Sequence, residues 1–207
     1  MKSIATRTLY TVMVTASLLI APAVLQAVPI TTNLDVCNEV LGLNGTFATV
    51  DVRLTGDNTV QFTVTPNADL LGRGDNFGIQ TFGFNSTIDI SHASFSLPSG
   101  WSVDYDRNLS MFGVFDASSS GTGRTRQDPL VFTITGEDIT DEAQFFVPTT
   151  LGYHYTAHIA GFSDHNGYTS AWFSDQSAPV PEPATLVLLG TGLLGLAGLR
   201  KRQKSTD

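Results

Sequence analysis

The fold is decided by the stretch Ala48-Thr49-Val50-Asp51-Val52-Arg53-Leu54-Thr55-Gly56-Asp57-Asn58-Thr59-Val60-Gln61-Phe62-Thr63-Val64-Thr65. Apolar and polar side chains alternate on both sides of the short Gly56-Asp57-Asn58 segment. This period of two is typical of strands with one buried face, and the polar segment between them favours a tight connection. The stretch therefore predicts an antiparallel β-hairpin, which Pro66 ends because proline cannot donate to a strand ladder.

Similar patterns continue through the rest of the central part of the chain. Further strands are expected at residues 77–85, 93–97, 102–105, 130–135 and 153–162. A loop is expected at 118–126, where little can be buried, and the only short helix is expected at 137–146. Many short strands without a fixed repeat indicate an all-β body, either a β-sandwich or a jelly-roll-like fold.

Both ends of the chain have the character of targeting segments. Residues 1–27 combine Lys2 and Arg7 with an apolar run and small residues, which predicts a secretory signal peptide cleaved after Ala27. Cleavage after Ala23 and retention as an N-terminal anchor are the alternatives. An extracytoplasmic domain is expected at residues 28–180, and 153 residues are enough to bury a core.

The expected domain is strongly acidic and contains one cysteine. It holds 17 of the 19 Asp and Glu residues but only five basic residues, all arginine, so its formal charge is close to −12. Such a surface repels nucleic acid, which is excluded as a partner. Cys37 has no partner for an internal disulfide, and burial is the expected state of its thiol.

The C-terminal segment has three elements in fixed order. Val180, Pro181, Glu182 and Pro183 form an extended stretch, because proline fixes φ and restricts the residue before it. Residues 184–199 carry no charge and predict a transmembrane helix of roughly 24 Å in contact with membrane lipid. The basic tail, residues 200–207, then predicts a cytoplasmic C-terminus, anchored by Arg200, Lys201 and Arg202.

This segment closely resembles the PEP-CTERM sorting signal, through Val180-Pro181-Glu182-Pro183, the Leu/Gly-rich span and Arg200-Lys201-Arg202. The resemblance implies processing near Pro-Glu-Pro by an exosortase-type enzyme, followed by placement at the cell surface or in the extracellular matrix. Members of this group are commonly linked to exopolysaccharide and biofilm. Similar tails are also described as an ice-binding-protein C-terminus, a name that implies nothing about this body.

No residue set in the body compels a metal or catalytic site. Asp104-Tyr105-Asp106 opens like a calcium loop, but Leu109 and Phe115 stand where an EF-hand needs glycine and glutamate. A looser calcium site is the one cofactor hypothesis, built from loop oxygens of Asp57, Asn58, Asp75, Asn76, Asp164 and Asn166. His154 and His158 are too far apart on a strand to share one zinc ion.

Aromatic residues supply the remaining hypothesis for the body. Trp101, Tyr105 and Trp172 are candidate carbohydrate contacts, although aromatic side chains of β-sandwiches more often belong to the core. Asp104 and Asp106 have a separation compatible with a glycosidase pair, without any further signature. We therefore predict a non-enzymatic surface or matrix protein with a structural, adhesive or carbohydrate-binding role. The alternative is a secreted hydrolase that acts on extracellular polymer.

Overall fold

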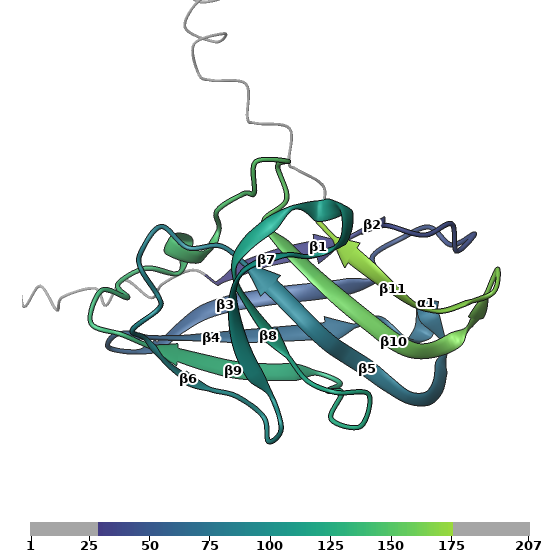
Figure 1. The fold of residues 1–207 in the computed structure, drawn as a ribbon, viewed down its shortest axis with the longest axis horizontal. Helices are drawn as coiled ribbons and strands as arrows, with labels where there is room; N and C mark the ends of the chain where they lie inside the picture. The colour runs from purple at the N-terminus through teal and green to yellow at the C-terminus, as the bar shows by residue number, and fades with distance from the viewer. Residues whose placement is uncertain (1–28, 176–207) are drawn as a thin grey trace, which may run out of the picture.

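The structure is a computed structural model, and it describes residues 29–175. Within them the chain forms two antiparallel β-sheets with very little helix, which confirms the all-β prediction (Figure 1). None of the helices in this range has the length and apolar content that crossing a bilayer requires. The expected signal peptide at 1–27 and transmembrane helix at 184–199 lie outside the described residues.

The predicted hairpin is confirmed at the centre of the smaller sheet. Strand β3 (Ala48–Gly56) pairs with β4 (Thr59–Pro66), so that Val50 lies opposite Val64 and Val52 lies opposite Phe62. The turn between them needs a left-handed residue, which Asn58 supplies with a φ of 59°. Thr49, Asp51 and Arg53 alternate with the buried positions, so one face is polar as expected.

Three further strands complete this five-stranded sheet, whose order is β1-β3-β4-β9-β6. Strand β1 (Ile30–Leu34) pairs with β3, and β9 (Leu130–Thr135) pairs with β4 in the register Phe62 to Phe132. The short strand β6 (Ser94–Ser96) covers the free edge of β9. Every pairing is antiparallel.

The second sheet has six strands in the order β2-β11-β10-β5-β8-β7. Its centre is formed by β5 (Arg73–Phe84) and β10 (Tyr155–His165), which run obliquely across β4 and β9 (Figure 1). The flanking strands are β2 (Val36–Cys37), β7 (Ser102–Asn108), β8 (Val114–Ser120) and β11 (Tyr168–Ser174). Strand β11 is the last element of the described chain, so the C-terminal end of the body belongs to this sheet.

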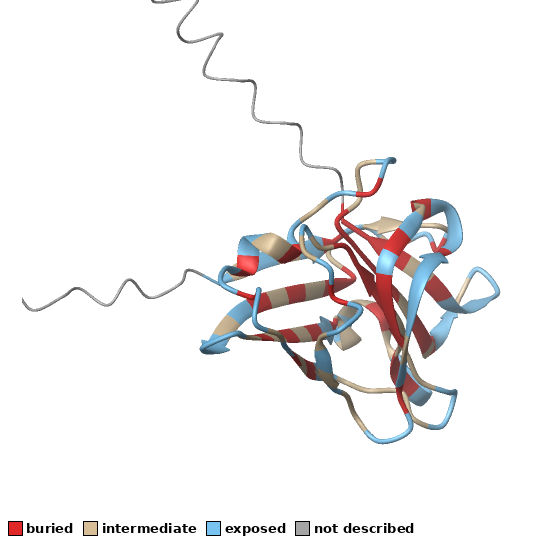
Figure 2. Cartoon of the chain, turned by 60° about the vertical axis from the view of Figure 1, so that its left-hand side comes forward, coloured by how far each residue is buried: buried red, intermediate tan, exposed pale blue. Residues whose placement is uncertain are grey.

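Aromatic side chains from both sheets meet in one core. Phe62 of the five-stranded sheet stacks on Phe132 at 4.9 Å and also lies 4.9 Å from Phe84 of the other sheet. Phe145 meets Phe62 edge-on at 5.6 Å. Offset and edge-on contacts add to the burial free energy of such rings. Figure 2 shows buried residues alternating with exposed ones along the strands that enclose this core.

Several local predictions were wrong. The expected loop at 118–126 begins as a continuation of β8, because Ser118 and Ser119 are small enough to be buried between neighbouring strands. The expected helix at 137–146 is only the 3-10 turn η2 (Glu142–Phe145), started by a capping box between Asp141 and Gln144.

Several elements had no counterpart in the predictions, among them the strands β1 and β2 and the 3-10 turn η1 (Ser110–Phe112). Helix α1 (Ala68–Leu71) is too short for a helical period, and it forms because the Asn67 side chain accepts a hydrogen bond from the Leu70 N–H. Strand β11 was missed because Gly167 precedes it and Tyr168, Thr169 and Ser170 at its start show no alternation of apolar and polar side chains. The Cys37 thiol is half-buried and free, and burial raises its pKa.

Candidate functional site

The C-terminal end of the body is fixed by one buried carboxylate. Asp175 Oδ1 accepts hydrogen bonds from the backbone N–H groups of His154, at 2.9 Å, and Tyr155, at 3.0 Å. Its second oxygen, Oδ2, lies 2.6 Å from His154 Nδ1. Asp175 is 2% exposed, so these contacts are shielded from water. They tie the end of β11 to the start of β10.

Aromatic rings close this network from the side. The Phe146 ring stacks flat on the His154 imidazole, with 3.8 Å between the ring centroids. Phe146 also contacts Tyr155, whose buried hydroxyl has no hydrogen-bond partner within the described residues. Burial and, secondarily, the charge of Asp175 raise the pKa of this tyrosine. The arrangement holds a carboxylate and an imidazole firmly, and no serine hydroxyl in residues 29–175 is hydrogen-bonded to a histidine ring.

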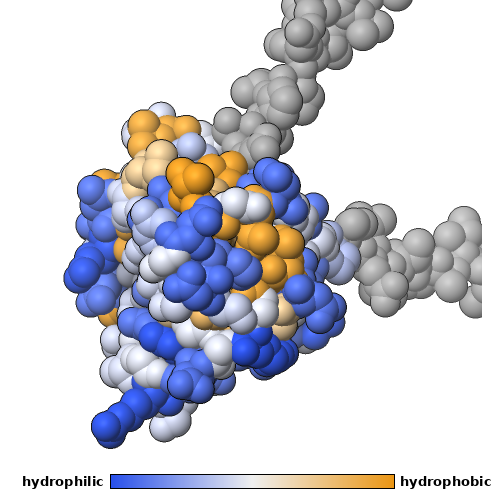
Figure 3. Space-filling view, turned by 90° about the vertical axis from the view of Figure 1, so that its right-hand side faces the viewer, coloured by the Kyte–Doolittle hydropathy of each residue, from blue (hydrophilic) through white to orange (hydrophobic). Residues whose placement is uncertain are grey.

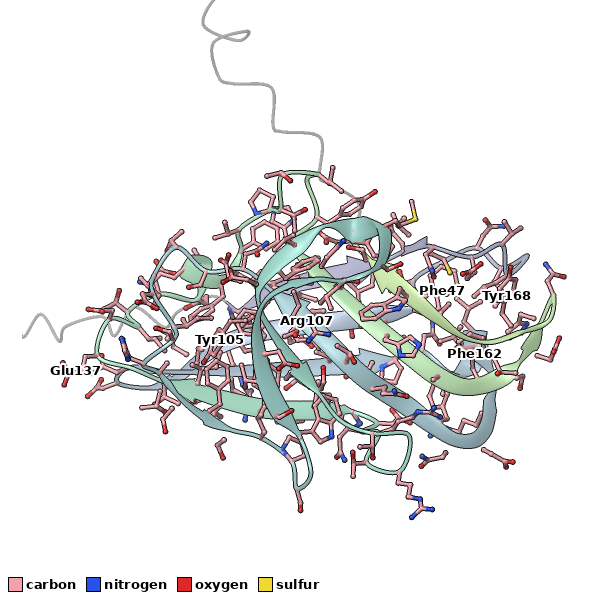
Figure 4. The ribbon with its side chains drawn as sticks, viewed as in Figure 1. Phe47, Tyr105, Arg107, Glu137, Phe162 and Tyr168 are labelled. Carbon is pink, nitrogen blue, oxygen red and sulfur yellow. The ribbon has the colours of Figure 1, made fainter. Side chains whose placement is uncertain are left out.

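The three aromatic residues predicted to contact carbohydrate do not gather at one place. Trp101 is 9% exposed, and its indole Nε1 donates to the Thr125 carbonyl at 2.7 Å. Tyr105 lies on the outermost strand β7 and meets Phe95 of the other sheet edge-on. Figure 4 shows Tyr105 far from Tyr168, the first residue of β11.

Trp172 lies on β11, three strands away from β8 in the sheet order and four from β7. With adjacent strands about 4.8 Å apart, Trp172 and Tyr105 are separated by roughly 19 Å. The register also places them on opposite faces, because Tyr105 shares the row of Ala117 and Phe84 whereas Trp172 shares the row of His158 and Thr81. A common stacking platform from these residues does not form.

Trp172 instead has a histidine as its direct neighbour. The His158 ring stacks on Trp172 with 5.0 Å between centroids, on the outer face of the six-stranded sheet. Burial and, secondarily, the positive charge of Arg126 lower the pKa of His158 to about 4. Arg126 is held over this face by a hydrogen bond from its Nε to Gln80 Oε1. This part of the outer face therefore combines polar and aromatic side chains, and the His158 ring is neutral at neutral pH.

The two histidines and the two aspartates considered as possible sites do not form paired sites either. His154 is engaged by Asp175 and His158 by Trp172, so the two rings have different partners. Asp104 forms an ion pair of 3.7 Å with Arg107, and Asp106 has a φ of 52°, which breaks the regular alternation between them. No group of three or more His, Cys, Asp or Glu residues within 29–175 is arranged to hold a metal ion.

The residues proposed for a looser calcium site belong to different elements: two turns and the start of β5. Asp57 and Asn58 form the β3–β4 turn, while Asp164 accepts a hydrogen bond from the Gly167 N–H in the β10–β11 turn. Asn76 has a φ of 53° and donates to the Gly123 carbonyl. Asp164 thus serves its own turn, as Asp commonly does, and Asn76 ties β5 to the loop that contains Gly123.

Two hollows lie away from the aromatic candidates. One, of about 390 Å³, lies beside Thr65, Asn67 and Arg73. Arg73 is already engaged there by a 2.5 Å ion pair with Asp128 and by the Phe77 ring. The other, of about 330 Å³, is lined mainly by the segments 88–93 and 136–139. Glu137 marks its position at the edge of the molecule in Figure 4.

Comparison with family models identifies the segment that follows the body. Residues 179–203 match the model described as the PEP-CTERM protein-sorting motif. The chain carries a PEP-CTERM tail. No curated protein and no solved structure matches the chain.

The PEP-CTERM match covers Val180, Pro181, Glu182, Pro183, Arg200, Lys201 and Arg202, which confirms the resemblance of the tail. The motif indicates an exported protein that an exosortase-type enzyme recognises and sorts. All of these tail residues lie outside the described part of the chain. Asp175 and His154, by contrast, had no sequence signal, because 21 positions separate them and neither lies in a motif.

Proposed function

We propose that this is a surface or extracellular-matrix protein that is released from the membrane by processing of its PEP-CTERM tail. A signal peptide at residues 1–27 directs export, and a transmembrane helix at residues 184–199 holds the exported chain. The basic residues 200–202 keep the C-terminus in the cytoplasm until the exosortase-type enzyme acts near Pro181-Glu182-Pro183. The mature protein is then the acidic β body.

The position at which the fold ends supports this proposal. Strand β11 ends at Ser174, and Asp175 is bound through its carboxylate to His154 and Tyr155. The matched motif begins at residue 179, so only residues 176–178 separate the two. A cut near Pro-Glu-Pro would leave every strand pairing of the body intact. A body that closes just before a processing motif is suited to release in folded form.

For the body we propose a structural or adhesive role, with binding to exopolysaccharide and without catalysis or a cofactor. Two sheets that enclose an aromatic core, as in a β-sandwich, give a rigid unit with two broad outer faces. The outer face of the five-stranded sheet presents Thr49, Thr63 and Thr133, hydroxyl groups that suit contact with a hydrated polymer. Trp172 supplies a half-buried aromatic surface on the other side.

The sorting proposal is tested by fractionating cells of the native host. Changing Pro181, Glu182 and Pro183 together to alanine should leave the full-length protein in the membrane, while the unchanged chain appears outside the cell in shorter form. Ala178→Ser, three positions before the motif core, is the matched control and should be released normally. Equal release of the triple variant would overturn the proposal.

The body is tested with exopolysaccharide purified from the same host. Co-sedimentation of the released protein should be retained in Tyr168→Ala and lowered at least threefold in Trp172→Ala. Production of new reducing ends from the polymer would instead favour the secreted-hydrolase alternative. If both variants bind the polymer as well as the unchanged protein does, Trp172 is not a contact.

A further inference from the structure

Exposed apolar side chains gather on two loops next to the end of the body. Met111 lies in the β7–β8 connection and Val114 is the first residue of β8, and they are 57% and 54% exposed. Leu151 and Phe146 belong to the segment that precedes β10 and are 57% and 37% exposed. These four residues are called the exit patch below. Both loops lie along the upper edge of the molecule in Figure 1, and Figure 3 shows apolar surface at that edge.

The two loops are held together by specific contacts. The Thr149 hydroxyl donates to the Phe112 carbonyl at 3.1 Å, and the Phe112 ring meets the Tyr153 ring edge-on at 4.9 Å. A Cβ added at Gly113 would be in van der Waals contact with the Thr149 side chain at 3.4 Å, so the two segments lie side by side. Phe112 itself is fully buried beneath the exposed residues. The exit patch therefore has a fixed shape.

The exit patch is joined directly to the last described residue. Phe146 stacks on the His154 ring, and His154 Nδ1 contacts the Asp175 carboxylate. The patch and the point where the tail begins are thus separated by a single side chain. Whatever surface the tail enters must lie close to this end of the body.

The two segments that carry the exit patch are themselves uncharged. The stretches 109–115 and 143–153 contain no Asp, Glu, Lys or Arg, although the expected domain 28–180 carries 17 acidic residues. An acidic surface is repelled by anionic lipid headgroups, whereas an uncharged apolar patch is not. Aliphatic and aromatic side chains also gain free energy when they enter the headgroup boundary.

The length of the linker sets how far the exit patch can move from a bilayer. Eight residues, 176–183, separate Asp175 from the proposed start of the transmembrane helix at Ala184. Even fully extended they span at most about 29 Å. The body is therefore tethered close to the lipid surface for as long as the tail is uncut.

We propose that the exit patch rests on the outer surface of the lipid bilayer while the tail is in the membrane. This inference rests on the proposed function, because it needs the transmembrane helix at 184–199. The contact orients the body with Asp175 toward the membrane and the β10–β11 turn away from it. It also holds the linker, and with it Pro-Glu-Pro, at the membrane surface. Four apolar side chains give a weak contact, so the body leaves once the tail is cut.

The experiment uses the full-length protein in phosphatidylcholine vesicles that contain a lipid with a nitroxide near its headgroup. In a Cys37→Ser background, a single cysteine replaces Met111, Leu151 or Val40 and carries a fluorophore that nitroxide quenches. Val40 is the matched control, because it is apolar and 81% exposed. Its carbonyl accepts from Asn166, which places it at the end of β10 remote from Tyr155.

The Asn38 N–H donates to the carbonyl of Trp172, three residues before Asp175, and Val40 follows Asn38 by two residues, so Val40 lies up to about 20 Å farther from the proposed lipid contact than Asp175 does. We expect at least threefold stronger quenching at positions 111 and 151 than at position 40. Adding Met111→Asp to the labelled Leu151→Cys chain should lower quenching there at least twofold. Val131→Asp, at a 40% exposed position of the other sheet, should not change it.

Equal quenching at all three positions, or none at 111 and 151, would overturn the inference. Protection of positions 111 and 151 from quenching that depends on the protein-to-lipid ratio would also overturn the inference. A second copy of the chain, rather than lipid, would then cover the exit patch. Flotation of the same vesicles separates the two proposals. A chain that does not float contradicts the proposed transmembrane helix, whereas a chain that floats without quenching contradicts only the lipid contact.

Discussion

Replacing Asp175 with alanine should weaken the body more than any other single change at its C-terminal end. The substitution removes the acceptor for two backbone N–H groups at 2.9 and 3.0 Å and for the His154 imidazole at 2.6 Å. Each buried donor left without a partner costs about 1–3 kcal/mol, and the three costs are not additive. The expected loss in the free energy of unfolding is therefore about 3–5 kcal/mol.

Asparagine at the same position is the informative comparison. Asp175→Asn keeps an oxygen for the two backbone N–H groups and loses only the charged contact with His154, so about 1–2 kcal/mol is expected. Asp164→Ala is the control, because its carboxylate accepts one hydrogen bond in an exposed turn. That change should cost less than about 1 kcal/mol.

The measurement is a urea titration of the full-length protein in mild detergent, followed by the fluorescence of Trp101, which is buried, and Trp172, which is half-buried. The midpoints should fall in the order wild type, Asp164→Ala, Asp175→Asn and Asp175→Ala. An Asp175→Ala protein as stable as wild type would refute the assignment of Asp175 as the group that fixes β11. An Asp175→Asn protein as weak as Asp175→Ala would show that the charge, rather than the backbone hydrogen bonds, dominates.

Three further changes test the fold. The pKa of His158 is about 4 in the folded protein and 6.5 when unfolded, so stability should fall as pH drops from 6.5 to 4. The loss should be about 1–2 kcal/mol after partial solvent exposure is allowed for, and His158→Gln should abolish it in urea titrations at several pH values. Gly161→Ala should lower the thermal midpoint by several degrees, because φ is +75° and the added Cβ would clash with the Asp75 carbonyl. Phe62→Ala should cost about 3–5 kcal/mol by chemical denaturation, since its ring contacts both sheets, and a cost below 1 kcal/mol would contradict its central place.

The strands with clean alternation were predictable because their two faces meet different surroundings. Val50, Val52 and Phe62 are buried while Thr49, Asp51 and Gln61 are not, so the hydrophobic period fixed β3 and β4. The same signal fails where burial depends on size rather than polarity. Ser118 and Ser119 are buried polar residues, and a pattern of apolar positions cannot reveal them.

The same limit separates the parts of the candidate site that could be predicted from those that could not. The tail motif could be found from Val180 to Arg202 because its residues are contiguous in the sequence. It does not depend on residues that folding brings together. Contacts such as Asp175 with His154, or Thr149 with Phe112, join residues that are far apart in the chain. They arise from strand order, which alternation does not determine. The aromatic hypothesis for Trp101 met the same difficulty, since its burial depends on which strands surround it.

The central claim is that the tail is removed and the body is released whole. Intact-mass spectrometry of the protein recovered outside the native host tests it most directly, because one mass fixes both ends of the chain. We expect a C-terminus after Asp175 and no later than Pro183, with the described strands all retained. A mass that includes residues 184–207, or a C-terminus before Asp175, would contradict the account.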